Sequence, residues 1–250
     1  MPAEITLGSP LIRLDHIDST NAYAMSIIKK REAGEGTVIL ADFQTGGRGQ
    51  KGNVWESQKG MNLTFSVILF PEFLEAGKQF YLLMSTSLGM IDLLKQAGIK
   101  AMIKWPNDIC VSGKKISGIL IENSLKGAYI SSSIVGIGLN VNQTHYVTPG
   151  IMPTSVKLET GREMNCDILF SETLRHLTIW IRKLYRNEWP AIREKYLQHL
   201  WQYHKWSDYA DSTGSFRGRI TDILEGGELV IEKQNGIYEK YLFKEIEYGS

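Results

Sequence analysis

A glycine-rich, basic segment is the first part of the sequence whose residue types could do chemistry. It reads Thr45-Gly46-Gly47-Arg48-Gly49-Gln50-Lys51-Gly52-Asn53-Val54-Trp55. Glycines let a backbone approach a ligand closely and offer N–H groups to anionic oxygens, and Arg48 and Lys51 add positive charge. Trp55 offers an aromatic face for a purine ring. No Walker or dinucleotide-binding pattern is present, so a basic surface loop is the competing interpretation.

Three shorter patterns follow along the chain. Lys104-Trp105-Pro106-Asn107-Asp108 places a lysine between an apolar run and a rigid proline turn. This predicts a fixed cation, although a snorkelling lysine beside an ordinary Asx turn gives the same pattern. The segments 115–122 and 135–142 carry glycines among apolar residues. The glycine of the first segment indicates close approach of a ligand or of another strand to the backbone, and those of the second mark either a strand that lines a cavity or a bulged core strand.

Taken together and in this order, the patterns resemble those of the biotin–protein ligases. The resemblance covers most of residues 11–142, and its motifs are Ser19-Thr20-Asn21, Gln44 with Gly47-Arg48-Gly49 and Trp55, Lys104 to Asp108, Lys115 with Gly118 to Glu122, and Gly136 to Asn140. The combination of Lys-Trp-Pro-Asn-Asp with the Gly-Arg-Gly loop is its most specific part.

The resemblance implies a two-step reaction with biotin and ATP as substrates. The biotin carboxylate attacks the α-phosphate of ATP, and a lysine of a biotin carboxyl carrier protein or domain then attacks the adenylate. A Mg²⁺ ion is expected for the triphosphate, but no carboxylate cluster in the sequence identifies its ligands, so the metal site is unknown. No residue stands out as a general base.

The resemblance also implies roles for individual residues. Lys104 and Arg48 are the expected catalytic cations, which would offset the repulsion between carboxylate and phosphate. The expected biotin-binding residues are Ser19, Thr20, Asn21, Gln44, Gly47, Arg48, Gly49, Gln50, Lys104 and Gly118. The expected ATP-binding residues are Arg48, Lys51, Asn53, Trp55, Lys104, Asn107, Lys115 and Asn140.

One position departs from the family pattern. Many family loops carry an arginine directly after Gly-Arg-Gly, and here that position is Gln50. We therefore expect retention of the adenylate to depend more on Arg48 and Lys51.

The elements that must position these residues predict an α+β protein. Helices are expected at 22–31, 80–97, 167–185 and 190–204, and strands at 11–17, 37–43, 62–70, 101–105 and 109–111, followed by a hairpin of 115–123 with 129–142. After residue 212 the texture changes to short strands, with an Asn-Gly hairpin signal at Asn235. This predicts a mixed sheet flanked by helices, like that of class II synthetases, in residues 1–208. Residues 209–250 would form a small SH3-like β-barrel.

The bulk properties limit the function classes. With 28 basic and 27 acidic residues, the chain has no overall field that would attract DNA or an anionic membrane. The residues before Ser19 are too few for the helix-turn-helix domain of repressor relatives, so we expect a ligase without DNA binding. Two distant cysteines and the lack of a signal or spanning segment favour a cytoplasmic protein. The oligomeric state, monomer or homodimer, is open.

Two other functions remain as alternatives. A lipoate or octanoate ligase shares the related fold and also uses a lysine. A non-catalytic nucleotide-binding module would keep the glycines of the cavity but would not need Lys104.

Overall fold

The computed structural model describes residues 5–49, 54–147 and 152–249. The first half of the chain contains β1 (Leu11–Leu14), α1 (Thr20–Lys29), β2 (Val38–Ala41), β3 (Asn62–Leu69), the 3₁₀ turn η2 (Ala76–Lys78), α2 (Phe80–Gln96), β4 (Met102–Lys104), β5 (Asp108–Val111), β6 (Lys114–Lys126) and β7 (Tyr129–Asn140). The second half contains α3 (Val156–Thr160), α4 (Cys166–Tyr185), α5 (Trp189–Gln198), β8 (Trp206–Asp211), β9 (Gly214–Ile223), β10 (Leu229–Lys233), β11 (Tyr238–Tyr241) and β12 (Ile246–Tyr248).

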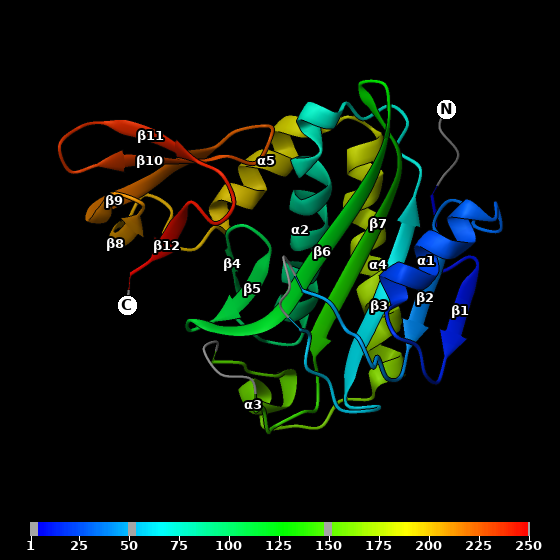
Figure 1. The fold of residues 1–250 in the computed structure, drawn as a ribbon. Coiled ribbons are helices and arrows are strands. Elements are labelled where there is room, and N and C mark those ends of the chain that lie inside the picture. The colour runs from blue at the N-terminus through cyan, green and yellow to red at the C-terminus, as the bar shows by residue number, and fades with distance from the viewer. Residues whose placement is uncertain (1–4, 50–53, 148–151, 250) are drawn as a thin grey trace.

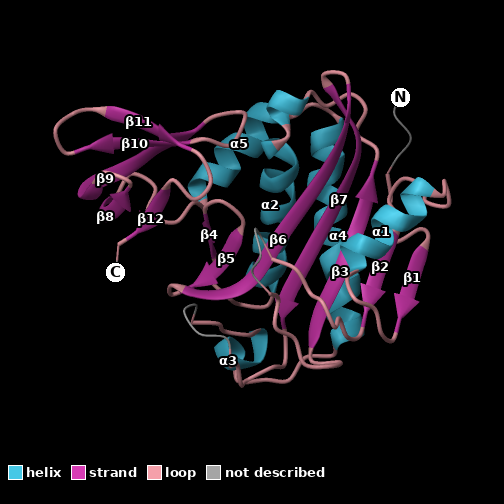
Figure 2. Cartoon of the chain, viewed as in Figure 1, coloured by secondary structure: helices cyan, strands magenta, loops and turns pink. Residues whose placement is uncertain are grey.

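A seven-stranded mixed sheet forms the body of the molecule (Figure 1). Its strand order is β1-β2-β3-β7-β6-β5-β4, in which only β1 and β2 run parallel. Helices α2 and α4 cover one face and α1 lies against the other (Figure 2). All eight residues of β3 are buried because both faces of this central strand are covered. On the α1 side of the sheet, no helix covers the long antiparallel pair β6–β7 beside α1 (Figure 2).

A five-stranded antiparallel sheet, which we call the β-module (206–249), follows the last helix. Its strand order is β11-β10-β9-β8-β12. It docks onto the first sheet through Trp105, whose indole nitrogen donates to the Gly227 carbonyl at 2.9 Å. The ring of Phe243 packs edge-on against the same indole at 5.3 Å between centroids.

The predicted α+β class, with a mixed sheet, flanking helices and a small C-terminal β-unit, is confirmed. Three local predictions differ from the structure. Strand β8 begins at Trp206, so it spans the domain boundary that we expected after residue 208. The helix expected to reach residue 204 ends at Gln198, because Gln202 and His204 adopt left-handed backbone angles that a helix cannot contain. The short elements α3, β8 and β12 were not predicted.

None of the helices in the described part of the chain is long and apolar enough to cross a bilayer. Both cysteines are free thiols. Burial raises the pKa of the Cys110 thiol to about 12. A buried thiol with a raised pKa is unreactive as a nucleophile.

Candidate functional site

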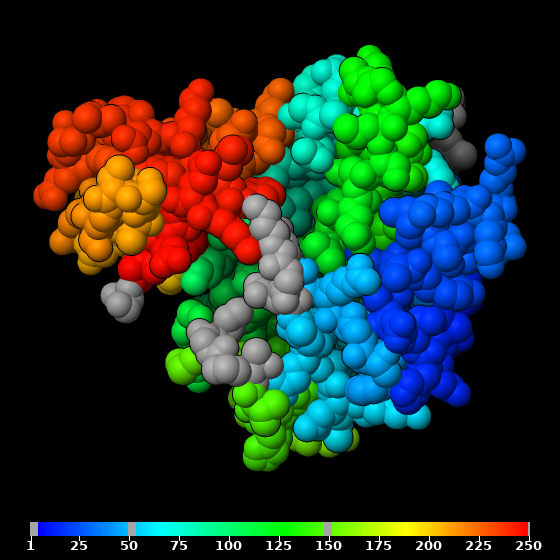
Figure 3. All heavy atoms as spheres, in the orientation of Figure 1, coloured from blue at the N-terminus to red at the C-terminus, as the bar shows by residue number. Residues whose placement is uncertain are grey.

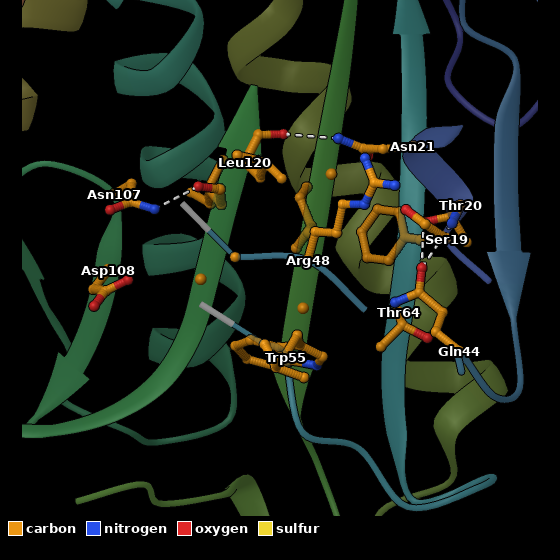
Figure 4. A pocket seen from close by; sticks show the side chains of 18 of the residues that line it. Ser19, Thr20, Asn21, Gln44, Arg48, Trp55, Thr64, Asn107, Asp108 and Leu120 are labelled. Atoms are coloured by element: carbon orange, nitrogen blue, oxygen red, sulfur yellow. Dashed lines mark hydrogen bonds between the residues drawn. The ribbon is translucent and has the colours of Figure 1, made fainter. Parts of the chain in front are cut away.

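A pocket opens on the face of the first sheet that carries α1, over strands β3, β7 and β6 (Figure 4). It brings together segments from both ends of the chain. Its lining residues are Ser19, Thr20, Asn21, Gln44, Arg48, Gly49, Val54, Trp55, Thr64, Phe65, Asn107, Asp108, Lys115, Gly118, Ile119, Leu120, Gly136, Ile137, Gly138 and Lys244. In the space-filling view, the loop after β2 and the end of the β-module lie on this same face (Figure 3).

One end of the pocket is polar and is built by the N-terminus of α1. Ser19 caps this helix, with its hydroxyl accepting from the Ala22 amide. A parallel bridge between Ile17 and Gln44 brings the Gln44 side chain to the helix start. The Gln44 carbonyl oxygen accepts from the backbone and hydroxyl of Thr20, at 2.7 and 3.0 Å (Figure 4). The Gln44 amide nitrogen is thereby left to donate to a ligand.

Beneath this end, a buried hydrogen-bond network fixes α1 to the sheet. The Ser66 hydroxyl of β3 lies 2.7 Å from the Thr20 hydroxyl and 2.6 Å from the Asn21 side-chain oxygen. The Asn21 amide nitrogen donates to the Glu122 carboxylate of β6 at 2.7 Å. A side chain at Gly136 would sit 2.4 Å from that Asn21 oxygen, so only glycine leaves room for the network.

The middle of the pocket is a flat glycine floor beneath the Trp55 indole. Gly118 of β6 pairs directly with Gly138 of β7. A Cβ added to Gly138 would meet the indole at 2.3 Å, and one added to Gly118 would meet it at 3.2 Å. Both glycines line the pocket and are paired without a bulge. Gly138 therefore belongs to a strand that lines a cavity and not to a bulged core strand.

The opposite end of the pocket is cationic. The Lys115 ammonium forms an ion pair with Asp108 at 2.6 Å and lies 5.8 Å from the centre of the Trp55 ring. Arg48 approaches from the glycine loop, which is held closed by a bridge from Arg48 to Val54 and by the Trp55 amide donating to the Gly47 carbonyl. Figure 4 shows the Arg48 side chain crossing the pocket above Trp55, with its guanidinium beside Asn21 at the polar end. Asn107 is fixed by its side-chain amide, which donates to the Ile119 carbonyl at 2.7 Å.

A second, shallower hollow lies on the other side of Trp55. Val54, Trp55 and Lys115 line both hollows, and the second is completed by Glu56, Asn140, Tyr146 and Pro153. The Asn140 amide nitrogen donates to the Thr154 carbonyl at 2.9 Å, but its side-chain oxygen is buried with no partner among the described residues. The Trp55 indole nitrogen is likewise buried and unpartnered there. Burial raises the pKa of Tyr146 to about 12, so its phenol is neutral.

The predicted role of Lys104 as the cation at the reacting groups stays a prediction, because the structure contains no substrate. Lys104 is not among the residues that line the pocket. Its ammonium lies 5.1 Å from the Trp201 ring and 4.8 Å from the Tyr248 ring, both of which belong to or adjoin the β-module. Lys104 ends the edge strand β4, and the apolar contact that attracts its side chain lies on the module side. Of the two motif lysines Lys104 and Lys115, it is Lys115 that lines the pocket.

The remaining predicted residues fall into three groups. The pocket unites Ser19, Thr20, Asn21, Gln44, Arg48, Gly49, Trp55, Asn107, Lys115 and Gly118. Gly47 and Asn140 lie beside it, through the loop and the second hollow. The predicted positions Gln50, Lys51 and Asn53 lie outside the described residues.

The pocket also contains a residue that the sequence did not indicate. Lys244 of the β-module lines it, although this residue follows the glycine loop by almost the whole length of the chain. A single lysine in a turn between two short strands carries no pattern that could reveal this position. Among the described residues, no group of three or more His, Cys, Asp or Glu side chains could hold a metal ion.

Comparison with known proteins decides the family. A sequence profile described as the biotin/lipoate A/B protein ligase family matches residues 14–140, just over half of the 250 residues. The chain is also 33% identical over 259 aligned residues to the bifunctional ligase/repressor BirA of Bacillus spizizenii. That alignment covers 97% of the chain and 75% of the relative. The chain belongs to the biotin/lipoate A/B protein ligase family.

Two further relatives support the same family over nearly the full length of this ligase. A biotin–[acetyl-CoA-carboxylase] ligase of Paracoccus denitrificans is 28% identical, with 89% of the chain and 94% of the relative covered. The solved structure of the biotin protein ligase from Aquifex aeolicus in complex with biotin and ATP superposes with a TM-score of 0.78 at 27% identity. That superposition covers 96% of this chain and 99% of the other. The resemblance to biotin–protein ligases seen in the motifs is confirmed.

Proposed function

We propose that this ligase activates biotin with ATP to biotinyl-5′-adenylate and transfers the biotinyl group to a lysine of a biotin carboxyl carrier protein or domain. The observation that carries the proposal is one continuous pocket with a hydroxyl and amide end, a glycine floor and a cationic end. Relatives whose names specify biotin ligation, and the biotin- and ATP-bound neighbour, support it.

The polar end suits the ureido ring of biotin. Ser19, Thr20 and Gln44 present hydroxyl and amide groups that can both donate and accept hydrogen bonds. The first two side chains are buried, at 4% exposure each, so a ligand lacking matching groups would leave them without partners. The apolar part of biotin would then lie beside the Trp55 indole, which itself covers Gly118 and Gly138, and its carboxylate would point toward the cations.

In the first step, a carboxylate oxygen of biotin forms a bond to the α-phosphorus and pyrophosphate leaves. Two anions must approach one another, so fixed positive charge lowers the barrier. Arg48 and Lys115 are pocket cations that come from two of the family motifs, and we assign them to the carboxylate and α-phosphate. Lys115 is held in place by Asp108 and therefore does not have to be ordered when substrate binds.

The second hollow suits the adenine ring. Trp55 offers an aromatic face there, and the unpartnered side-chain oxygen of Asn140 can accept a hydrogen bond from an exocyclic amine. A Mg²⁺ ion would neutralise charge on the triphosphate. Since Asp108 is the one carboxylate lining the described pocket and is paired with Lys115, the ion would be held mainly by phosphate and water oxygens.

In the second step, the amine of the carrier lysine attacks the carbonyl of the adenylate, AMP leaves, and the amine loses a proton. Enclosure of the mixed anhydride protects it from water until then. Retention of the adenylate would rest on Arg48 and on Lys51, because the family's second loop arginine is Gln50 here.

The test is pyrophosphate release by the purified protein with ATP and either biotin or lipoate, followed by transfer to a carrier domain. We expect release with biotin only, and labelled carrier after the domain is added. Release with lipoate and not with biotin would contradict the biotin assignment. Release with neither, together with measurable ATP binding, would instead support a non-catalytic nucleotide-binding module.

A further inference from the structure

Lys244 is a cation that the β-module contributes to the ligase pocket. It stands in the turn between β11 and β12 and lines the pocket together with Asn107, Asp108 and Lys115. Along the strand order, the latter three belong to the β5–β6 side, whereas the polar biotin end lies at α1 beside β3. The neighbouring Phe243 packs against Trp105, which stands two residues before Asn107, so Lys244 approaches the pocket from the β5 side and not from α1.

The turn that carries Lys244 is rigidly anchored. The adjacent Phe243 ring packs against Trp105 at 5.3 Å and against Phe80 at 6.3 Å between centroids. Within the turn, the Leu242 amide donates to the Glu245 carboxylate at 2.7 Å, and the Glu245 amide donates to the Leu242 carbonyl at 3.1 Å. An exposed lysine on such a turn is held at one place relative to the first sheet.

The backbone of Lys244 is strained. Its φ is +71°, in the left-handed region that glycine or asparagine adopts at little cost and lysine does not. Strained positions persist where the surrounding structure imposes them, and they concentrate at functional sites. The pocket location gives this position a use for the lysine side chain that glycine could not supply.

The charge of Lys244 is also uncommitted. Lys115 is neutralised in part by Asp108 at 2.6 Å, whereas Lys244 makes no ion pair with any described carboxylate. Lys244 is exposed at the mouth, and Lys115 lies deeper. A triphosphate whose α-phosphate lies beside Arg48 and Lys115 would extend its outer phosphates toward the mouth.

We propose that Lys244 binds the β- and γ-phosphates of ATP and stabilises the departing pyrophosphate, so that the β-module completes the nucleotide site. The proposal rests on the proposed function for the position of the α-phosphate. It assigns the phosphate contact to a residue that the sequence motifs do not include.

The test compares Lys244→Ala, Lys244→Arg and Lys244→Gly with Lys240→Ala, which removes another exposed lysine of the same module. Calorimetric titration with ATP and Mg²⁺, in the presence and absence of biotin, should show about a tenfold weaker affinity for Lys244→Ala, as expected for loss of one charged contact. Lys244→Arg should recover most of this loss, and Lys240→Ala should match wild type. Affinity for biotin and for biotinyl-5′-adenylate should not change.

Lys244→Gly separates the charge from the fold. Because glycine relieves the left-handed strain, it should melt at a higher temperature than Lys244→Ala while binding ATP equally weakly. Unchanged ATP affinity in Lys244→Ala would overturn the proposal, and so would an equal loss of adenylate affinity. If the wild-type protein releases pyrophosphate with biotin but the Lys244 variants keep wild-type ATP affinity, the role of Lys244 is refuted and the proposed function stands. If ATP binding depends on Lys244 but no pyrophosphate is released with biotin, the proposed function is refuted and the role of Lys244 in binding ATP stands.

Discussion

At the scale of single residues, two lysines of neighbouring motifs have different surroundings. Lys115 faces the pocket and is paired with Asp108, whereas Lys104 lies against the rings of Trp201 and Tyr248. Cation–π contacts of this kind attract the Lys104 ammonium to the faces of the two rings. We therefore expect substitution of Lys115 to lower the reaction rate and substitution of Lys104 to lower stability.

Lys115→Ala should lower biotin-dependent pyrophosphate release by about 100- to 1000-fold, the loss typical of a preorganised charge at a transition state. Lys104→Ala should retain most of the rate and lower the melting temperature. Rates from an assay at saturating ATP and biotin test this, and Lys114→Ala, an exposed neighbour, is the control. Loss of release in Lys104→Ala with an unchanged melting temperature would return the catalytic role to Lys104.

Gly138 is the residue on which the Trp55 indole rests. Gly138→Ala should displace the indole, because the added Cβ would stand 2.3 Å from it. Since the atoms met belong to the Trp55 side chain and not to the backbone, we expect the free energy of unfolding to change by less than about 1 kcal/mol while the KM for ATP rises about tenfold. Gly77→Ala, where nothing lies within 4 Å, is the matched control. An unchanged KM for ATP in Gly138→Ala would show that Trp55 does not hold the nucleotide.

At the scale of elements, the junction of α1 with the sheet determines the polar end. The Ser66 hydroxyl of β3 meets Thr20 and Asn21 at the start of the helix, and all three are buried. Loss of a buried hydrogen-bond partner leaves the remaining groups unsatisfied. The position of the helix start, and with it of the biotin-binding hydroxyls, depends on this contact.

Ser66→Ala should therefore destabilise the protein by about 1–3 kcal/mol and raise the KM for biotin more than that for ATP. Ser133→Ala is a matched control, since Ser133 is fully buried on β7 and its hydroxyl has no partner among the described residues. It should leave stability unchanged or increase it. Chemical denaturation with steady-state kinetics measures both effects, and equal destabilisation by the two changes would contradict the role of the network.

At the scale of the whole molecule, Trp105 joins the ligase core to the β-module. Its indole N–H reaches the Gly227 carbonyl at 2.9 Å, and its ring contacts Phe243, the residue before Lys244. The same side chain therefore holds together the two sheets and the turn that reaches the pocket.

Trp105→Phe keeps an aromatic ring but removes the donor, which should cost about 1–3 kcal/mol for the unsatisfied carbonyl. We expect faster proteolysis within residues 199–214 and a higher KM for ATP, with the KM for biotin unchanged. Lys104→Ala should act in the same direction on proteolysis. A change in the KM for biotin equal to that for ATP would indicate damage to the whole pocket instead.

Local sequence was sufficient for the long elements. The run 80–97 has helical spacing and becomes α2, and the runs on either side of Gly127 become the β6–β7 hairpin, because each follows from residues close in the chain. The short β12 was missed because it exists by pairing with β8, which lies far from it in the sequence. Helix α3 has local caps at Ser155 and Gly161, but it is too short for helical spacing to reveal it.

The sequence by itself determined the family, because the motifs are short runs of residue types whose order does not depend on packing. It also determined most of the residues that meet at the pocket, from Ser19 to Gly118. Only the tertiary structure decided which lysines line the pocket. The Lys104 ammonium lies against the rings of Trp201 and Tyr248, which are distant in the sequence. Lys244 reaches the pocket because the β-module docks onto the first sheet. The direction of a long, flexible side chain is set by such contacts, and local sequence does not contain them.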